Sequence, residues 1–441
     1  MNWRKTGIIL AWVGLACFYV PLSYLALHEE WGGDFASYYG ASHMLFEGAN
    51  PYQDVVHDSR LPTQGHLVYN PNPPLTLLLF SVFSYFDYPV AFGLWLLFSF
   101  TLGLIGADRC FRLLFNDAFF KHYRSRLMLI YLAAFPVLMN TILLQFGGVL
   151  LLLMTLGYES YLKQDNFKAS VWWGGLIALK LFPGLLFFYA FLKQRYQLML
   201  ALIVSTAVFS LAPMMYTGPV VYGHCLRLIQ QGIVWYGVNW NLSIQGYFYR
   251  ILVTFPKTVG AAYAHAPVQH AALAYLLYLV AACVMLLGWI NAFKKLEQGS
   301  CHRGIAVLLI LMLLLSPMGW LYYLPMLLLP LSCTFCDGLK HPWRMGLWFF
   351  AVFLLFFPMK MTHVPAMTSM ALKLGLFSVQ FYGLLLLGYL VWTTQVEPKS
   401  IQIGDIPEYA KQGLIWVWLY SLSFIVVRYF MIFLMKLLER A

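Results

Sequence analysis

Long apolar runs separated by short polar connections make up most of the chain. Five runs are about as long as a helix that crosses the hydrocarbon core of a bilayer, which needs roughly 20 apolar residues. Because lipid offers the backbone no hydrogen-bond partners, such runs must form helices. They cover residues 7–27, 198–212, 266–292, 368–392 and 413–438. The whole pattern predicts an all-α polytopic integral membrane protein of one domain, 1–441, with about 11–13 transmembrane helices.

Basic residues gather in short connections between these runs and set the expected orientation. Connections rich in Lys and Arg face the cytoplasm under the positive-inside rule. The run after Arg4 and Lys5 is longer than the apolar part of a secretory signal, so we expect a retained first helix with a cytoplasmic N-terminus. The first loop, 28–73, and the second, 213–265, then lie on the outer face, and a polar connection at 393–412 precedes the last helix. The basic connections contain Lys193, Arg195, Lys294, Lys295, Arg303, Lys340 and Arg344.

Composition agrees with a membrane protein and removes some classes of function. Of the 441 residues, 61% are hydrophobic and 10% are charged, whereas soluble domains have roughly 25% charged residues. The basic connections explain the formal net charge of +11, so nucleic acid is not an expected partner. Seven dispersed cysteines argue against a disulfide framework and a zinc site. His43, His57 and His66 match no metal-ligand spacing, so neither a metal nor a cofactor is expected.

Acidic residues are nearly absent from the predicted spans. Ion-coupled transporters usually bury carboxylates there, where a charge is costly and therefore functional. No inverted repeat is evident in the sequence either. A solute transporter or lipid flippase is therefore the less favoured alternative, and the chemistry is expected in the outer loops. Six of the seventeen acidic residues lie in the first loop, namely Glu29, Glu30, Asp34, Glu47, Asp54 and Asp58.

The segment WGGDFASYYGASHMLFEGANPY, residues 31–52, predicts a helix over 34–47. Apolar and aromatic side chains recur from Phe35 at helical spacing, and Gly48 is typical of a helix end. Asp34 falls at the expected N-cap, where a carboxylate accepts hydrogen bonds from the amides of the first turn. Capping alone would explain this aspartate, and catalysis is the alternative.

Four short motifs follow one another along the chain. The first, D-F-x-x-Y-Y…G-x-x-P-Y, contains Asp34, Phe35, Tyr38, Tyr39, Gly48, Pro51 and Tyr52, and the second, K-x-x-P before a basic cluster, contains Lys180, Pro183, Lys193 and Arg195. The third, N-x-S-x-x-G-x-x-x-R, contains Asn241, Ser243, Gly246 and Arg250, and the fourth, S-P-x-x-W, contains Ser316, Pro317 and Trp320. With these motifs in this order, the chain resembles the polyprenol-phosphate-dependent glycosyltransferases of the GT-C superfamily, in particular the α-mannosyltransferase-like family eighty-seven. Relatives often have histidines after that tryptophan, where this chain has Tyr322 and Tyr323.

The resemblance implies a GT-C-type fold whose two outer-face loops carry the site, in a bacterial inner membrane. It implies transfer of a hexose, mannose being expected, from a polyprenyl-phosphate sugar to a lipid or glycan acceptor. A β-linked donor would give an α product. The chain has no G-x-G-x-x-G, G-x-x-x-x-G-K-[ST] or D-x-D sequence, which also disfavours a nucleotide-sugar pocket. An enzyme that uses another polyprenyl-phosphate sugar, such as arabinose, is the alternative.

Within this hypothesis, Asp34 is the general base that takes a proton from the acceptor hydroxyl. The leaving phosphate needs its charge neutralised. Arg250 is the first candidate for that task, because a guanidinium can bind two phosphate oxygens at once. Lys180 is the second, and its alternative role is pairing within the helix bundle.

The remaining candidates have equally ordinary structural roles. Asn241 and Ser243 can bind substrate or can cap and fix a loop. Tyr38 and Tyr39 can stack on a sugar or anchor a helix at the membrane interface. Trp320 and Tyr322 complete the expected substrate-binding residues.

Overall fold

Helices and short 3₁₀ turns form the computed structural model, which describes residues 3–28, 33–52, 61, 70, 72–253, 270–297, 302–359, 361–362, 364 and 368–438. Within those ranges there is no strand, and the only β-type pairing is an isolated bridge between Asn241 and Trp320. The predicted all-α class is therefore confirmed. His57, His66 and parts of both predicted outer loops lie outside the described residues.

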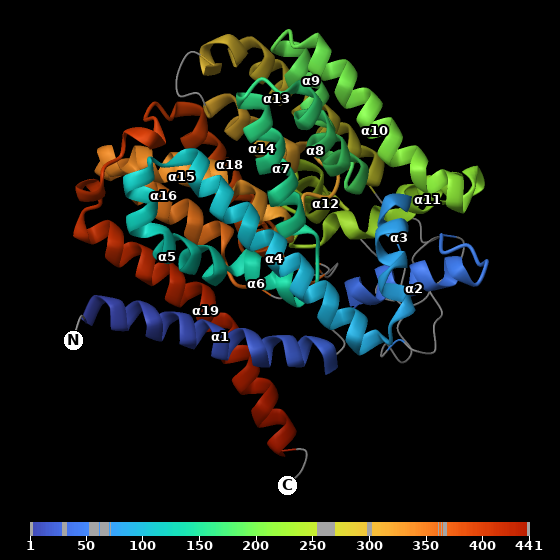
Figure 1. The fold of residues 1–441 in the computed structure, drawn as a ribbon, viewed down its shortest axis with the longest axis horizontal. Coiled ribbons are helices and arrows are strands. Elements are labelled where there is room, and N and C mark those ends of the chain that lie inside the picture. The colour runs from blue at the N-terminus through green and yellow to red at the C-terminus, as the bar shows by residue number, and fades with distance from the viewer. Residues whose placement is uncertain are drawn as a thin grey trace.

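The helices follow one another with short connections (Figure 1). The first half of the chain contains α1 (Trp3–His28), α2 (Gly33–Phe46), α3 (Pro74–Ser81), η2 (Phe83–Tyr85), α4 (Tyr88–Leu114), α5 (Asp117–Ala133), α6 (Phe135–Ile142), α7 (Gly147–Leu162), α8 (Asn166–Leu179), η3 (Phe182–Gly184), α9 (Leu185–Leu192) and α10 (Tyr196–Thr217). The second half contains α11 (Pro219–Gln231), η4 (Gly232–Gly237), α12 (Ile244–Leu252), α13 (Ala271–Glu297), α14 (Arg303–Leu315), η5 (Leu321–Leu327), α15 (Leu328–Lys340), α16 (Pro342–Leu355), α17 (Met370–Leu374), η6 (Leu376–Ser378), α18 (Val379–Thr393), η7 (Pro398–Ser400), η8 (Ile403–Asp405) and α19 (Glu408–Leu438).

Among the described residues, five helical segments are long and apolar enough to cross a membrane. They are Thr6–Tyr24, Tyr88–Leu114, Tyr196–Thr217, Ala271–Leu296 and Met370–Thr393. The α5–α6 pair, bent by 60°, makes a sixth if it counts as one span, and four further apolar helices are shorter. These helices identify a multi-pass membrane protein. The predicted total of about 11–13 stays a prediction, because the number of spans depends on how the shorter apolar helices are counted. The apolar run at 303–330, for example, is divided between α14, η5 and α15.

Local sequence explains where several helices begin. The side chain of Asn116 accepts a hydrogen bond from the amide of Phe119 at the start of α5, and Asp165 does the same for Lys168 at the start of α8. Such caps satisfy amides that have no partner within the helix. Between α5 and α6, Pro136 stands at the start of the new helix, where a missing N–H costs nothing.

Small residues let the central helices approach closely. A Cβ on Gly148 of α7 would lie 3.0 Å from the Cα of Gly103 in α4, so the two backbones are nearly in contact. Close packing of this kind is typical of helices in membranes, where lipid is as apolar as the side chains. It fixes α7 against α4 and thereby positions the turn that precedes α7.

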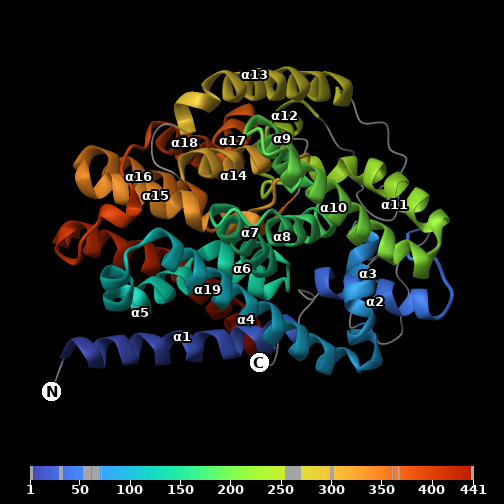
Figure 2. The same ribbon diagram turned by 45° about the horizontal axis from the view of Figure 1, so that its top comes forward.

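The predicted helix over 34–47 is confirmed as α2, Gly33–Phe46. Asp34 lies in its first turn rather than at the N-cap position before it. One face of α2 packs on the start of α4, where the ring centroids of Phe35 and Phe92 are 5.5 Å apart. Figures 1 and 2 show α2 and α3 together at one end of the molecule, remote from the N-terminus of α1.

Candidate functional site

The carboxylate of Asp34 meets a turn from a distant part of the chain. Its Oδ2 accepts a 2.7 Å hydrogen bond from Nε2 of Gln145. Its Oδ1 has no hydrogen-bond partner among the residues that the structure describes. Asp34 is half-buried, whereas residues 35–42 of α2 are buried. One oxygen is therefore held and the other is available to a substrate.

Gln145 owes its position to an unusual turn between α6 and α7. Leu144 has a φ of 50°, a left-handed conformation that is uncommon for a leucine. This turn lets the backbone N–H of Gln145 donate to the carbonyl of Asn140 at 3.0 Å. The hydroxyl of Tyr38 then donates to Oε1 of Gln145 at 2.8 Å. The oxygen of the Gln145 side-chain amide thus faces Tyr38, and its nitrogen faces Asp34.

Burial raises the pKa of Asp34 above its usual value. The hydrogen bond from Gln145 and the positive charge of Lys180 partly oppose this shift. A carboxylate with a raised pKa is a stronger base than one in water, and catalytic carboxylates are often adjusted in this direction.

Lys180 lies at the end of α8 and outside the candidate spans. Its Nζ donates to Oδ1 of Asn72 at 2.5 Å and lies 5.5 Å from the ring centroid of Phe146 and 5.8 Å from that of Tyr323. Within the described residues no carboxylate contacts the ammonium directly, although Asp34 is close enough to interact electrostatically. The side chain is partly exposed, so this cation can receive an anion.

The segment after Trp320 adds aromatic side chains beside Lys180. The rings of Trp320 and Tyr322 are stacked with centroids 5.7 Å apart, and Tyr323 stacks on Phe182 at 4.8 Å. Gly147, at the start of α7, is required here, because a Cβ would collide with the carbonyl oxygen of Tyr322. The first turn of α7 therefore holds η5 against the turn that carries Gln145.

Asn241 and Ser243 fix the loop before α12 through hydrogen bonds to backbone groups. Asn241 is fully buried, donates to the carbonyls of Tyr236 and Pro317, and accepts from the amides of Ser243 and Gly319. Ser243 caps α12 by accepting from the amide of Gly246 at 2.9 Å. These contacts join the 238–243 loop to the segment 317–321, which leads to Trp320 and Tyr322.

Arg250 is 2% exposed and holds the same loop from its other side. Its Nη1 donates to the carbonyls of Val238 at 3.0 Å and Asn241 at 2.7 Å, and its Nε donates to Ser378 at 3.2 Å. Its Nη2 is buried and has no partner among the described residues. The guanidinium is thus largely committed to the backbone, and phosphate binding by Arg250 stays a prediction.

The structure brings together Asp34 and Tyr38, which both bond to Gln145, and Lys180 and Tyr322, which both lie beside the ring of Tyr323 at 5.8 and 4.9 Å. Tyr39 points elsewhere, since its hydroxyl donates to the carbonyl of Phe86 at 2.7 Å. The third motif, Asn241 to Arg250, is joined to this group through the segment 317–321, where the carbonyl of Pro317 accepts from Asn241.

Gln145 and Asn72 were not predicted from the sequence, yet both touch predicted site residues. Gln145 is a single amide in the run ILLQFGG, and Asn72 belongs to the proline-rich NPNPP. For Gln145, a polar residue inside an apolar run was the available signal. Tyr52 of the first motif also has a partner there, because its hydroxyl donates to the carbonyl of Asn72 at 2.7 Å. Among the described residues, no group of three His, Cys, Asp or Glu side chains could hold a metal ion.

Comparison with known proteins gives one family match, to glycosyltransferase family 87 over residues 70–317. That range contains Asn72, Gln145, Lys180 and Arg250, whereas Asp34 lies before it. No curated protein and no solved structure matched the chain. The matched range is more than half of the chain, and we conclude that this multi-pass membrane protein belongs to glycosyltransferase family 87 and is a glycosyltransferase.

Proposed function

We propose that this glycosyltransferase moves a hexose, mannose on the family resemblance, from a polyprenyl phosphate to a hydroxyl of a lipid or glycan acceptor. The observation that carries the proposal is the geometry around Asp34. One carboxylate oxygen is fixed by Gln145 at 2.7 Å, and a partly exposed lysine lies within electrostatic range. A base and a cation side by side match a reaction that forms one C–O bond and releases a phosphate.

Asp34 acts as the general base in this proposal. Its Oδ1 accepts the proton of the acceptor hydroxyl while the hydroxyl oxygen attacks the anomeric carbon from the face opposite the phosphate. The bond to the phosphate oxygen breaks as the new bond forms, so the configuration inverts. Gln145 keeps the carboxylate oriented, and the raised pKa of Asp34 strengthens it as a base.

Lys180 is the better candidate for the donor phosphate, ahead of Arg250. Its ammonium has one amide oxygen, that of Asn72, and two aromatic faces as neighbours. It can therefore turn toward a phosphate without breaking an ion pair. Arg250, by contrast, is 2% exposed, and its Nη1 already holds carbonyls at 2.7 and 3.0 Å, so only the buried Nη2 remains for a phosphate. We assign Arg250, Asn241 and Ser243 the positioning of Trp320 and Tyr322.

The location on the outer face is supported by the charges at the opposite ends of the same helices. α4 begins beside Phe35 and ends with Arg109 and Arg112, and α7 begins beside Gln145 and ends with Lys163 next to it. Under the positive-inside rule the basic ends are cytoplasmic. Asp34 then lies near the outer surface, where the head of a lipid-linked sugar is accessible and its tail stays in the bilayer.

The test is an in vitro transfer assay with the purified full-length protein. Labelled mannose and arabinose would each be offered as polyprenyl-phosphate sugars, with nucleotide sugars as the comparison and membrane lipids as acceptors. We expect transfer from polyprenyl-phosphate mannose only. Transfer from the arabinose donor would indicate the alternative sugar, and transfer from a nucleotide sugar would overturn the assigned donor class.

A further inference from the structure

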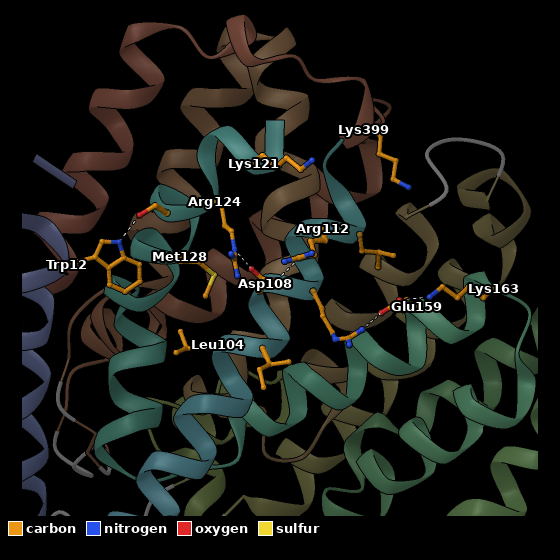
Figure 3. A pocket seen from close by; sticks show the side chains of 14 residues that line it. Trp12, Leu104, Asp108, Arg112, Lys121, Arg124, Met128, Glu159, Lys163 and Lys399 are labelled. Carbon is orange, nitrogen blue, oxygen red and sulfur yellow. Dashed lines mark hydrogen bonds and ion pairs between the residues drawn. The ribbon is translucent and has the colours of Figure 1, made fainter. Parts of the chain in front are cut away.

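A second polar site lies at the opposite end of α4 from Asp34. It is a cavity of about 1150 Å³ between α1, α4, α5, α7 and η7 (Figure 3). Residues 88 and 109 of α4 are about 30 Å apart along the helix axis at 1.5 Å per residue. The cavity is therefore separate from the proposed catalytic site.

The cavity has a large excess of positive charge. Asp108 is shared by Arg112 at 2.7 Å and Arg124 at 2.6 Å, and Glu159 is shared by Arg109 and Lys163. Two carboxylates thus face six cations. Lys121 and Lys399 are exposed, and their ammonium groups contact no acidic residue in the described part of the chain. The six cations are Arg109, Arg112, Lys121, Arg124, Lys163 and Lys399.

The other lining residues make one side of the cavity apolar. On α4, Leu104 and Ile105 come one turn before Asp108, and Ile105 is 42% exposed. On α5, Met128 comes one turn after Arg124. On α1, Trp12 donates to Ser125 at 2.7 Å and closes this side. Charged residues therefore lie toward one end of the cavity, and apolar residues lie toward the middle of spans α1 and α4.

We propose that this cavity binds the headgroup of an anionic phospholipid whose acyl chains lie along Trp12, Leu104 and Ile105. A soluble anion would use only the charged end, whereas a lipid uses both ends. Basic pockets between spanning helices are suited to phosphate headgroups, and the positive-inside rule assigns this end to the cytoplasmic leaflet. Lys121 and Lys399 provide charge for the phosphate without the loss of an existing ion pair.

The test measures lipid binding to the delipidated full-length protein by native mass spectrometry. Phosphatidylglycerol and phosphatidylcholine with identical acyl chains would be titrated at low salt. We expect about tenfold tighter binding of phosphatidylglycerol. The double variant Lys121→Gln/Lys399→Gln should weaken it by about 25-fold, since each lysine near an anionic headgroup contributes roughly a fivefold factor.

The matched control is Lys294→Gln/Lys295→Gln, which removes two exposed lysines of a basic connection outside the cavity. This variant should bind phosphatidylglycerol as the parent protein does. Equal binding of the two lipids, or an equal loss in both double variants, would overturn the site. Inorganic phosphate would be added as a further probe. If millimolar phosphate displaces the lipid and raises the melting temperature as much as phosphatidylglycerol does, the cavity would be assigned to a soluble anion instead.

Discussion

Gln145 and Asp34 are 111 residues apart in the sequence and are joined by a 2.7 Å hydrogen bond from amide to carboxylate. An ionised carboxylate only accepts hydrogen bonds, so the side-chain amide of Gln145 directs its nitrogen at Asp34, and Tyr38 donates to the amide oxygen at 2.8 Å. An aspartate that served only as a helix cap would bond to amides of its own first turn. The contact with Gln145 instead holds the carboxylate of α2 against the turn before α7, and a general base needs such a fixed position.

Replacing Asp34 by Asn separates structural from catalytic roles. Asn can still accept a hydrogen bond from Gln145 and is nearly the same size, so we expect an unchanged melting temperature. Loss of a general base typically lowers the rate by about 100- to 10,000-fold. Turnover with labelled donor and binding of unlabelled donor would be measured side by side. A variant with near parental turnover would show that the carboxylate has a structural role only.

Replacing Gln145 by Glu tests whether this residue adjusts the pKa of Asp34. The new carboxylate places a like charge beside Asp34, which raises the pKa of Asp34 further. The acidic limb of kcat/KM should therefore move to higher pH. Tyr38→Phe is the matched control, because it removes one hydrogen bond from the same amide and adds no charge. An acidic limb that moves equally in both variants would contradict an electrostatic role for Gln145.

The sequence predicts the elements better than it predicts the site. The aromatic spacing after Asp34 predicts α2 to within a residue at each end, because helical periodicity is a local property. The contact with Gln145 depends on a left-handed Leu144 and on close packing of α4 against α7, neither of which has a local signal. Arg250 shows the converse. Its motif is visible in the sequence, but only the fold reveals that two backbone carbonyls occupy its guanidinium.

Removal of the Arg250 guanidinium should lower stability before it affects donor binding. Arg250→Ala leaves the carbonyl of Asn241 buried without this donor, at a cost of about 1–3 kcal/mol, whereas the carbonyl of Val238 keeps the backbone amide of Asn241 as its partner. We expect a clearly lower melting temperature in detergent. Ser378→Ala, which removes the 3.2 Å contact to Nε and the 2.8 Å hydrogen bond from Ser378 to the carbonyl of Lys373, should have a smaller effect because both Nη1 contacts remain.

Arg250→Lys keeps the charge and gives the decisive kinetic result. If Arg250 only positions the loop, folded Arg250→Lys protein should have a nearly parental KM for the donor, with any loss in kcat. A KM raised more than about tenfold at unchanged melting temperature would instead indicate direct contact with the phosphate, because lysine lacks the two-pronged geometry of arginine.

The pH dependence of kcat/KM should report both members of the proposed pair. Asp34 must be ionised to accept a proton, and burial raises its pKa, so activity should fall on the acidic side at a pH above the usual aspartate range. Lys180 must be protonated to bind the phosphate, and burial lowers its pKa to about 8, so activity should also fall above that pH. A sugar phosphodiester keeps one negative charge throughout this range.

The surrounding tyrosines, Tyr38, Tyr322 and Tyr323, have pKa values raised by burial and do not titrate there. Lys180→Arg, whose guanidinium stays protonated to a pH of about 12, should abolish the alkaline limb and leave the acidic limb in place. An alkaline limb that persists in Lys180→Arg would show that another group binds the donor phosphate.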